Sequence, residues 1–118
     1  MATERTYSRG DIWQVDFGND PQDPEQAWPR PGLVVSANML HHPRLQMVVV
    51  VPGTSAVRGL QLHVEVDPDP ENGLDRTTAF QLEQVRAVST RRLTEHLGRI
   101  DAQALRTVDQ VLRRVLDN

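Results

Sequence analysis

The sequence contains no cysteine, no lysine and few aromatic residues. Without cysteine the chain has no disulfide, no thiolate metal ligand and no cysteine nucleophile. Aromatic residues make up 4% of the chain, too few for the broad base-stacking surface of many single-strand-binding proteins. No apolar run approaches the roughly 20 residues of a membrane helix, and the N-terminus lacks a charged-then-apolar export signal. We therefore expect a cytoplasmic protein that does not engage a membrane.

Every basic residue is an arginine, and the charges are distributed unevenly. The formal net charge is −3. Residues 1–85 carry six Arg against twelve Asp and Glu, a balance of −6, whereas residues 86–118 carry seven Arg against four acids, a balance of +3. The arginine side chain is a planar fork that stays charged and fits phosphate oxygens. The net charge does not require a nucleic-acid partner, but the basic C-terminal part permits a local phosphate-binding patch.

The chain is long enough for one domain and too short for two, at 118 residues. We expect a flexible N-terminal segment at residues 1–8 and a single domain at residues 9–118. Residues 18–29 form a predicted loop, because they are rich in Asp and Pro and end in Trp-Pro. Loops of about twelve residues are uncommon inside compact domains and often border a functional site.

Alternating or β-branched segments predict short strands, at residues 11–17, 33–36, 47–51, 60–66 and 77–88, the last as one or two strands. The unbroken run from Val48 to Val51 is typical of a strand buried on both faces, and Pro52 with Gly53 is expected to end it. In the strand at 60–66, alternation places His63 on the polar face.

The C-terminal part predicts helix. Ser89 and Thr90 are suited to cap a short helix at residues 91–97, with Gly98 at its end. Asp101 can cap a final helix, whose inward face is formed by Leu105, Val108, Leu112, Val115 and Leu116. The whole pattern predicts an α+β fold that is mainly β: a small antiparallel barrel or half-barrel followed by a C-terminal α-helix.

Several familiar functional motifs are absent. The sequence has no glycine-rich phosphate loop and no zinc-binding helix motif. His41 and His42 are adjacent, but neighbouring residues of an extended chain point apart, and no carboxylate is spaced to join them. Two prolines interrupt the acidic turn at residues 67–75, which excludes a calcium loop of the EF-hand kind. We therefore expect neither a metal site nor a cofactor.

Polar residues stand at the edges of the predicted strands. Arg30 directly precedes one strand, and Thr54 and Ser55 directly follow the valine-rich strand. Gln84 and Arg86 alternate with apolar residues on a later strand. Taken singly, each is typical of an ordinary surface or turn position. Their order along the chain carries the functional signal.

Four segments in this order resemble the MazF/PemK family of bacterial toxins. They are residues 10–16 (Gly-Asp-Ile-Trp-Gln-Val-Asp), residues 30–36 (Arg-Pro-Gly-Leu-Val-Val-Ser), residues 51–55 (Val-Pro-Gly-Thr-Ser) with Arg58-Gly59, and residues 82–86 (Leu-Glu-Gln-Val-Arg). The resemblance extends from Arg9 to Leu116. It departs from the family at Gly53, where many relatives carry an aliphatic residue, and in the acidic loop at residues 18–29.

The resemblance implies a fold, an activity and partners. The fold is a compact SH3-like β-barrel with a C-terminal helix. The activity is sequence-specific, metal-independent cleavage of single-stranded RNA by a homodimer, which a MazE-type antitoxin holds silent. The family's catalytic positions fall on Arg30 and Thr54. Its RNA-binding positions fall on Ser55, Arg58, Gln84 and Arg86.

The chemistry that follows is attack of a 2′-hydroxyl on the adjacent phosphorus, leaving a 2′,3′-cyclic phosphate and a 5′-hydroxyl. Arginine is effectively always protonated, so Arg30 suits charge stabilisation better than proton abstraction. Water, His41 and His63 are the alternatives for the base. Two other functions share the fold: a CcdB-like toxin that traps DNA gyrase through its C-terminal helix, and an inactive barrel that only binds a partner.

Overall fold

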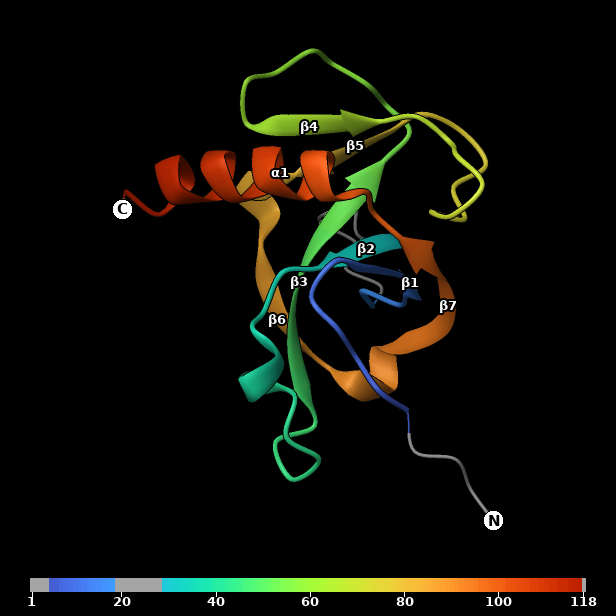
Figure 1. The fold of residues 1–118 in the computed structure, drawn as a ribbon, viewed down its shortest axis with the longest axis vertical. Coiled ribbons are helices and arrows are strands. Elements are labelled where there is room, and N and C mark those ends of the chain that lie inside the picture. Colours follow the sequence, from blue (N-terminus) through green and yellow to red (C-terminus); the bar gives the residue numbers. More distant parts are fainter. Residues whose placement is uncertain (1–4, 19–28, 118) are drawn as a thin grey trace.

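The computed structural model describes residues 5–18 and 29–117, so residues 1–4 of the predicted flexible segment and residues 19–28 of the predicted loop lie outside it. The described residues form seven strands, three short 3-10 helices and one α-helix (Figure 1). The strands are β1 Asp11–Val15, β2 Arg30–Val34, β3 Met47–Thr54, β4 His63–Val66, β5 Thr78–Gln81, β6 Arg86–Ser89 and β7 Leu93–Arg99. The helices are η2 Asn38–Leu40, η3 Leu82–Gln84, η4 Thr90–Arg92 and α1 Ala102–Val115.

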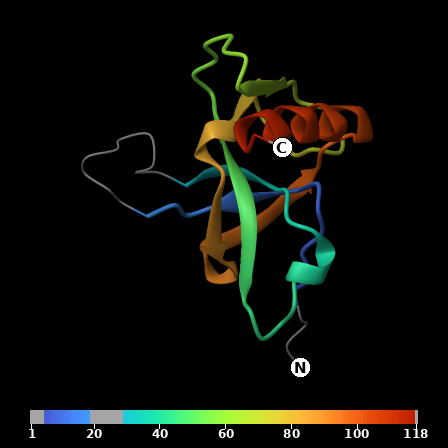
Figure 2. The same ribbon diagram turned by 90° about the vertical axis from the view of Figure 1, so that its left-hand side faces the viewer.

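The strands form one antiparallel sheet in the order β4-β5-β3-β2-β1-β7, and β6 pairs with β3 beside this path. Strand β3 organises the sheet, because its residues 47–50 pair with β6 and its residues 53–54 pair with β5. Figure 2 shows β3 running through much of the height of the molecule. The sheet curls without closing. The predicted fold class is confirmed, with the half-barrel as its form.

Apolar residues from the sheet and the helix form two clusters. The first lies between α1 and the sheet and includes Phe80, Leu82 and Val108, each fully buried. The second includes Trp13, Phe17 and six other buried residues of the sheet and its connections. Helix α1 lies alongside β4 (Figure 1). Within the described part of the chain, no helix has the length and apolar character that crossing a membrane requires.

The final helix is confirmed, together with its cap. The Asp101 carboxylate accepts a hydrogen bond from the Ala104 N–H at 2.8 Å, which satisfies one of the free donors of the first turn. Val108 faces the core, but the prediction that Leu116 also faces it is wrong, because that side chain is 53% exposed. Leu116 is the C-cap residue, and the chain turns away there through Asp117 at a φ of 58°.

The predicted helix at residues 91–97 is wrong. Ser89 does cap a turn, but this is the 3-10 helix η4, which gives way at Leu93 to strand β7. Strand β7 pairs along the whole of β1. The backbone groups of β1 on that edge need hydrogen-bond partners, and this pairing outweighs the local capping signals. Gly98 accordingly lies inside a strand rather than at a helix end.

Pro52 and Gly53 do not end their strand, contrary to the prediction, and β3 continues to Thr54. Pro52 lies between the part of β3 that pairs with β6 and the part that pairs with β5. A missing N–H donor is tolerated at such a junction. At Gly53 the packing leaves no room for a side chain, since a Cβ would lie 2.5 Å from the Thr78 Cγ2 atom.

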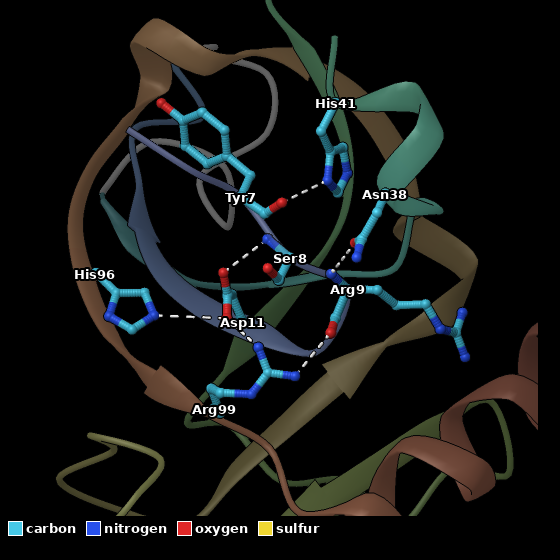
Figure 3. A network of polar contacts seen from close by, with 8 residues as sticks. All are labelled: Tyr7, Ser8, Arg9, Asp11, Asn38, His41, His96 and Arg99. Atoms are coloured by element: carbon cyan, nitrogen blue, oxygen red, sulfur yellow. Dashed lines mark hydrogen bonds and ion pairs between the residues drawn. The ribbon is translucent and has the colours of Figure 1, made fainter. Parts of the chain in front are cut away.

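A network of polar contacts ties the first described residues to the sheet (Figure 3). The Asp11 side chain is 7% exposed, accepts from the Ser8 N–H at 2.8 Å and pairs with the Arg99 guanidinium at 2.6 Å. His96 lies 3.6 Å from the same carboxylate. The Arg9 N–H donates to the Asn38 side chain at 3.1 Å. Residues far apart in the sequence thus hold the beginning of β1 against β7.

Candidate functional site

A groove of about 520 Å³ opens where β2 begins and β3 ends. Its walls come from Gln14 of β1, the residues around Arg30, the end of β3, the turn at residues 73–76 and Leu97 of β7. These segments meet because neighbouring antiparallel strands bring the start of one beside the end of the next. The groove therefore collects Arg30, Thr54 and Ser55, three of the strand-edge residues that the sequence pattern singles out.

Arg30 and Thr54 lie at the neighbouring ends of the paired strands β2 and β3. Gly32 stands opposite Pro52, and Leu33 opposite Val51. This pairing ends two residues short of Arg30 on β2 and of Thr54 on β3, and both residues line the groove. The two predicted catalytic residues are thus brought together.

The guanidinium of Arg30 is held from two sides. Its Nη2 donates to the Gln81 side-chain oxygen at 3.1 Å. Its Cζ lies 5.6 Å from the centroid of the Phe17 ring, within cation–π range. The Cζ of Arg86 lies 5.8 Å from the same ring. One buried aromatic ring therefore brings a second arginine close to Arg30.

The hydroxyl of Thr54 is oriented by the turn that follows it. Its Oγ1 accepts from the Ala56 N–H at 3.1 Å. A threonine hydroxyl has one hydrogen and two acceptor positions. Because the backbone contact uses an acceptor position, the hydrogen stays available for an oxygen atom in the groove. Thr54 is half-buried and can reach a bound molecule.

The groove has a mixed charge. Besides Arg30 it contains Arg76 and Asp75, which form an exposed ion pair at 3.3 Å. Pairs this exposed, with 67% and 84% of the two side chains accessible, contribute little free energy and separate readily. The arrangement can therefore bind a phosphodiester, with arginine forks for its oxygens and a hydroxyl to fix its position.

A family model described as PemK-like, MazF-like toxin of type II toxin-antitoxin system matches residues 8–116. The chain belongs to this family. It is 32% identical over 114 residues to endoribonuclease MazF9 of Mycobacterium tuberculosis, covering 92% of this chain and 95% of the relative. It is 29% identical over 107 residues to endoribonuclease EndoA of Bacillus subtilis, covering 89% and 90%.

Solved structures share the fold. MazF of Deinococcus radiodurans superposes with a TM-score of 0.81 at 22% identity, covering 98% of this chain and all of that one. A mycobacterial endoribonuclease in complex with its cognate antitoxin superposes with a TM-score of 0.75 at 20% identity, covering 95% and 96%. The SH3-like family fold that the sequence resemblance implies is the fold observed here.

The other predicted site residues of this MazF-like toxin are spread more widely. Ser55 lines the groove and is exposed, whereas Arg58 is exposed in the loop beyond it. Gln84 lies in the 3-10 helix η3, not on a strand as predicted, and Arg86 is the first residue of β6. The 3-10 turn is needed because β5 and β6 pair with different parts of β3, so the chain must cross from one to the other.

Neither histidine considered as a base is among the described residues that line the groove. His63 does not lie on a solvated face as predicted: its side chain is 1% exposed and its Nε2 contacts Glu83 at 2.9 Å. His41 contacts the Ser36 hydroxyl at 2.6 Å and the Tyr7 carbonyl at 2.7 Å. A carbonyl only accepts, so Nδ1 of His41 carries a hydrogen. Both rings are thus engaged elsewhere in the toxin.

The sequence pattern did not point to Gln81 or Phe17, two residues that contact Arg30. The sequence offers only a weak indication that Gln81 belongs to the site. Gln81 is the one amide in strand β5, whose other residues are apolar or small, and every residue of this strand is buried. Phe17 resembles any apolar residue at a strand end. Asp75 ends the predicted acidic turn at residues 67–75, and Arg76 directly follows it. Only the packing of that turn against β7 brings them to the groove.

Proposed function

We propose that this MazF-like toxin cleaves single-stranded RNA in the groove, with Arg30 and Thr54 as its catalytic residues. The observation that carries the proposal is that Arg30, at the start of β2, and Thr54, at the end of β3, line one groove. Membership of the toxin family and the endoribonuclease relatives support the same activity. The CcdB-like alternative, a gyrase poison, has no support in these comparisons.

The reaction begins with the 2′-hydroxyl of one nucleotide, which attacks the adjacent phosphorus. The bond to the 5′-oxygen breaks, giving a 2′,3′-cyclic phosphate and, once that oxygen takes a proton, a 5′-hydroxyl. Negative charge builds on the phosphoryl oxygens in the transition state, where the fork of Arg30 stabilises it. Because the nucleophile is the 2′-hydroxyl, the same groove does not cleave DNA.

Thr54 holds a phosphoryl oxygen or the attacking hydroxyl through the hydrogen that its Ala56 contact leaves available. Arg30 is permanently charged and therefore does not take the proton. Of the three bases considered, His41 and His63 are engaged away from the groove. Water is then the proton acceptor.

Four further residues bind the RNA on either side of the cleaved bond. Ser55 lies on the groove wall, and Arg86 reaches the same ring as Arg30. Arg58 and Gln84 are exposed beyond the groove and contact flanking nucleotides. Contacts to phosphate fix the position of the strand, whereas contacts to bases select the cut sequence.

The partners follow from the family. The toxin acts as a homodimer, and a MazE-type antitoxin silences it by laying an acidic segment in the groove. Two structures with the same fold support an antitoxin partner. One is a mycobacterial endoribonuclease in complex with its cognate antitoxin, and the other is the MazE-MazF complex of Deinococcus radiodurans. Because its substrate is messenger RNA, the toxin acts in the cytoplasm. Its organisation as one domain from residue 9 to residue 118 is part of the same proposal.

The decisive experiment is cleavage of a single-stranded RNA by Arg30→Ala in the presence of EDTA. We expect a loss of about 10² to 10³ in rate, the usual cost of removing one charge-stabilising donor. Arg106→Ala, on the exposed face of α1, is the matched control and keeps wild-type activity. Circular dichroism and thermal unfolding verify that both variants fold. Full activity of Arg30→Ala would contradict the catalytic role proposed for Arg30.

Thr54→Val tests the second catalytic residue, because valine keeps the branched shape and removes the hydroxyl. The rate of RNA cleavage should fall in the same direction as for Arg30→Ala. If only the melting temperature falls while cleavage is unchanged, Thr54 is a turn residue without a catalytic part.

A further inference from the structure

Gln81 is a buried polar residue whose presence the local structure does not require. It ends strand β5, is 2% exposed and stands between the fully buried Phe80 and Leu82. Burying an amide costs free energy unless the amide is hydrogen-bonded. Its oxygen accepts from Nη2 of Arg30, a residue 51 positions earlier in the chain, at 3.1 Å. The contact that compensates for burying Gln81 is thus made with the catalytic arginine.

The contact also constrains the arginine. A long arginine side chain has many rotamers, and most of them direct the guanidinium away from a given point. Gln81 and Phe17 are two of the contacts of Arg30. The amide oxygen fixes one end of the guanidinium, and the ring supports the group from a second direction. Together they limit both the position and the direction of the fork.

We propose that Gln81 is a positioning residue, which aims the Arg30 guanidinium at the cleaved phosphate. Gln81 is not among the described residues that line the groove, so it acts through Arg30 without touching the RNA. The inference rests on the proposed function and deepens it. Displacing a catalytic group by about 1 Å can cost about 10²-fold in rate, so the loss of one anchor has a measurable effect.

The alternative interpretation gives Gln81 a purely structural role, in which Arg30 only supplies the hydrogen bond that the buried amide needs. The two readings differ in kinetics. Gln81→Met keeps the length of the side chain and removes the oxygen acceptor. For a positioning residue kcat falls about 10- to 100-fold and KM stays within about threefold. For a structural residue the melting temperature falls and kcat of the folded protein is unchanged, which would overturn the proposal.

Two companion variants sharpen the comparison. Gln81→Glu keeps an oxygen in the position that accepts from Arg30, and should restore kcat to within about threefold of wild type. Gln110→Met makes the same chemical change on the exposed face of α1 and should leave kcat and KM unaltered. A kcat for Gln81→Glu as low as that of Gln81→Met would contradict a role for the oxygen acceptor.

A double-mutant cycle tests whether Gln81 acts through Arg30. In the Arg30→Ala background, Gln81→Met should add less than about a twofold loss, because its target is gone. A full additional loss would show that Gln81 acts independently of Arg30. The cycle also separates this inference from the function itself. An active Arg30→Ala protein overturns the proposed function, whereas an active Gln81→Met protein beside an inactive Arg30→Ala overturns the positioning role alone.

A measurement on the unchanged protein keeps the proposal testable if Gln81→Met fails to fold. Nuclear magnetic resonance resolves the guanidinium N–H signals of an arginine whose rotation is restricted. Comparison with Arg30→Ala identifies those of Arg30. We expect separate, slowly averaging Nη signals for Arg30 in the wild-type toxin. A freely rotating Arg30 guanidinium would contradict the anchoring by Gln81.

Discussion

At the scale of single residues, Thr54 follows a glycine that the packing of the groove wall requires. A Cβ at Gly53 would lie 2.5 Å from the Thr78 side chain and 3.2 Å from the Phe80 ring. The departure from the family pattern at this position therefore matches the close packing around Gly53. It lets β3 approach β5 closely, and this approach sets the place of the Thr54 hydroxyl.

Gly53→Ala should consequently lower both stability and activity. Forcing one methyl group into a filled space costs about 1 to 3 kcal/mol. The strain also moves Thr54, so RNA cleavage should fall more than the loss of folded protein explains. Urea unfolding and single-turnover cleavage measure the two effects. Wild-type stability in this variant would show that the space at Gly53 is not filled.

At the scale of elements, the acidic turn at residues 67–76 is a wall of the groove because it packs tightly on β7. A Cβ at Gly73 would meet the Leu97 carbonyl at 2.0 Å, and one at Gly98 would meet the Glu71 carbonyl at 2.1 Å. The Arg99 N–H donates to that Glu71 carbonyl at 2.9 Å. Two glycines on facing segments thus allow backbone to touch backbone.

Gly98→Ala should separate the turn from β7 and impair cleavage. Its Cβ would collide with backbone rather than with a flexible side chain, so the segments must move apart. Since the turn carries Arg76, we expect KM for RNA to rise, together with a loss of stability of at least about 1 to 3 kcal/mol.

Asp101→Ala is the control for a variant that is merely less stable. It removes the cap of α1, whose carboxylate accepts from Ala104 at 2.8 Å, and should cost about 0.5 to 2 kcal/mol of stability. The cap lies outside the groove lining, so KM should stay unchanged at a temperature where both variants are folded. Equal KM values for Gly98→Ala and Asp101→Ala would refute the role of the turn.

At the scale of the whole molecule the net charge is −3, so we expect RNA to bind through a local cluster of cations. Arg30 and Arg76 line the groove, and Arg86 shares a ring with Arg30. Among the described residues, Asp75 pairs with Arg76 of this cluster at 3.3 Å, an exposed ion pair that separates readily. The salt dependence of the RNA-binding constant should then reflect a few contacts between arginine and phosphate, and not the overall charge of the protein.

The expected salt dependence is moderate. For single strands the logarithm of the binding constant falls by about 0.7 per phosphate contact for each unit of log salt concentration. Three arginines give a slope of about −2, and Arg86→Ala should reduce it by about 0.7. Fluorescence anisotropy with an uncleavable 2′-O-methyl RNA measures both slopes. A slope near zero would exclude phosphate binding by this cluster.

The sequence by itself determined the features that depend on neighbouring residues. The alternation of β1, the valine run of β3 and the Asp101 cap of α1 all lie within a few residues, and local conformational preferences were enough to predict them. The order of the four family segments also singled out Arg30 and Thr54, and both line one groove of the structure. Their catalytic roles stay a prediction.

The tertiary structure decided what depends on distant partners. Residues 93–99 form a strand rather than the predicted helix because the edge of β1 pairs with them, some 80 residues away in sequence. Gln81 faces Arg30 across 51 positions, and no local pattern marks that contact. Hydrogen bonding between sheet edges and close packing between distant segments override local preference. The fold class could therefore be predicted from the sequence, whereas the surroundings of Arg30 were decided only by the tertiary structure.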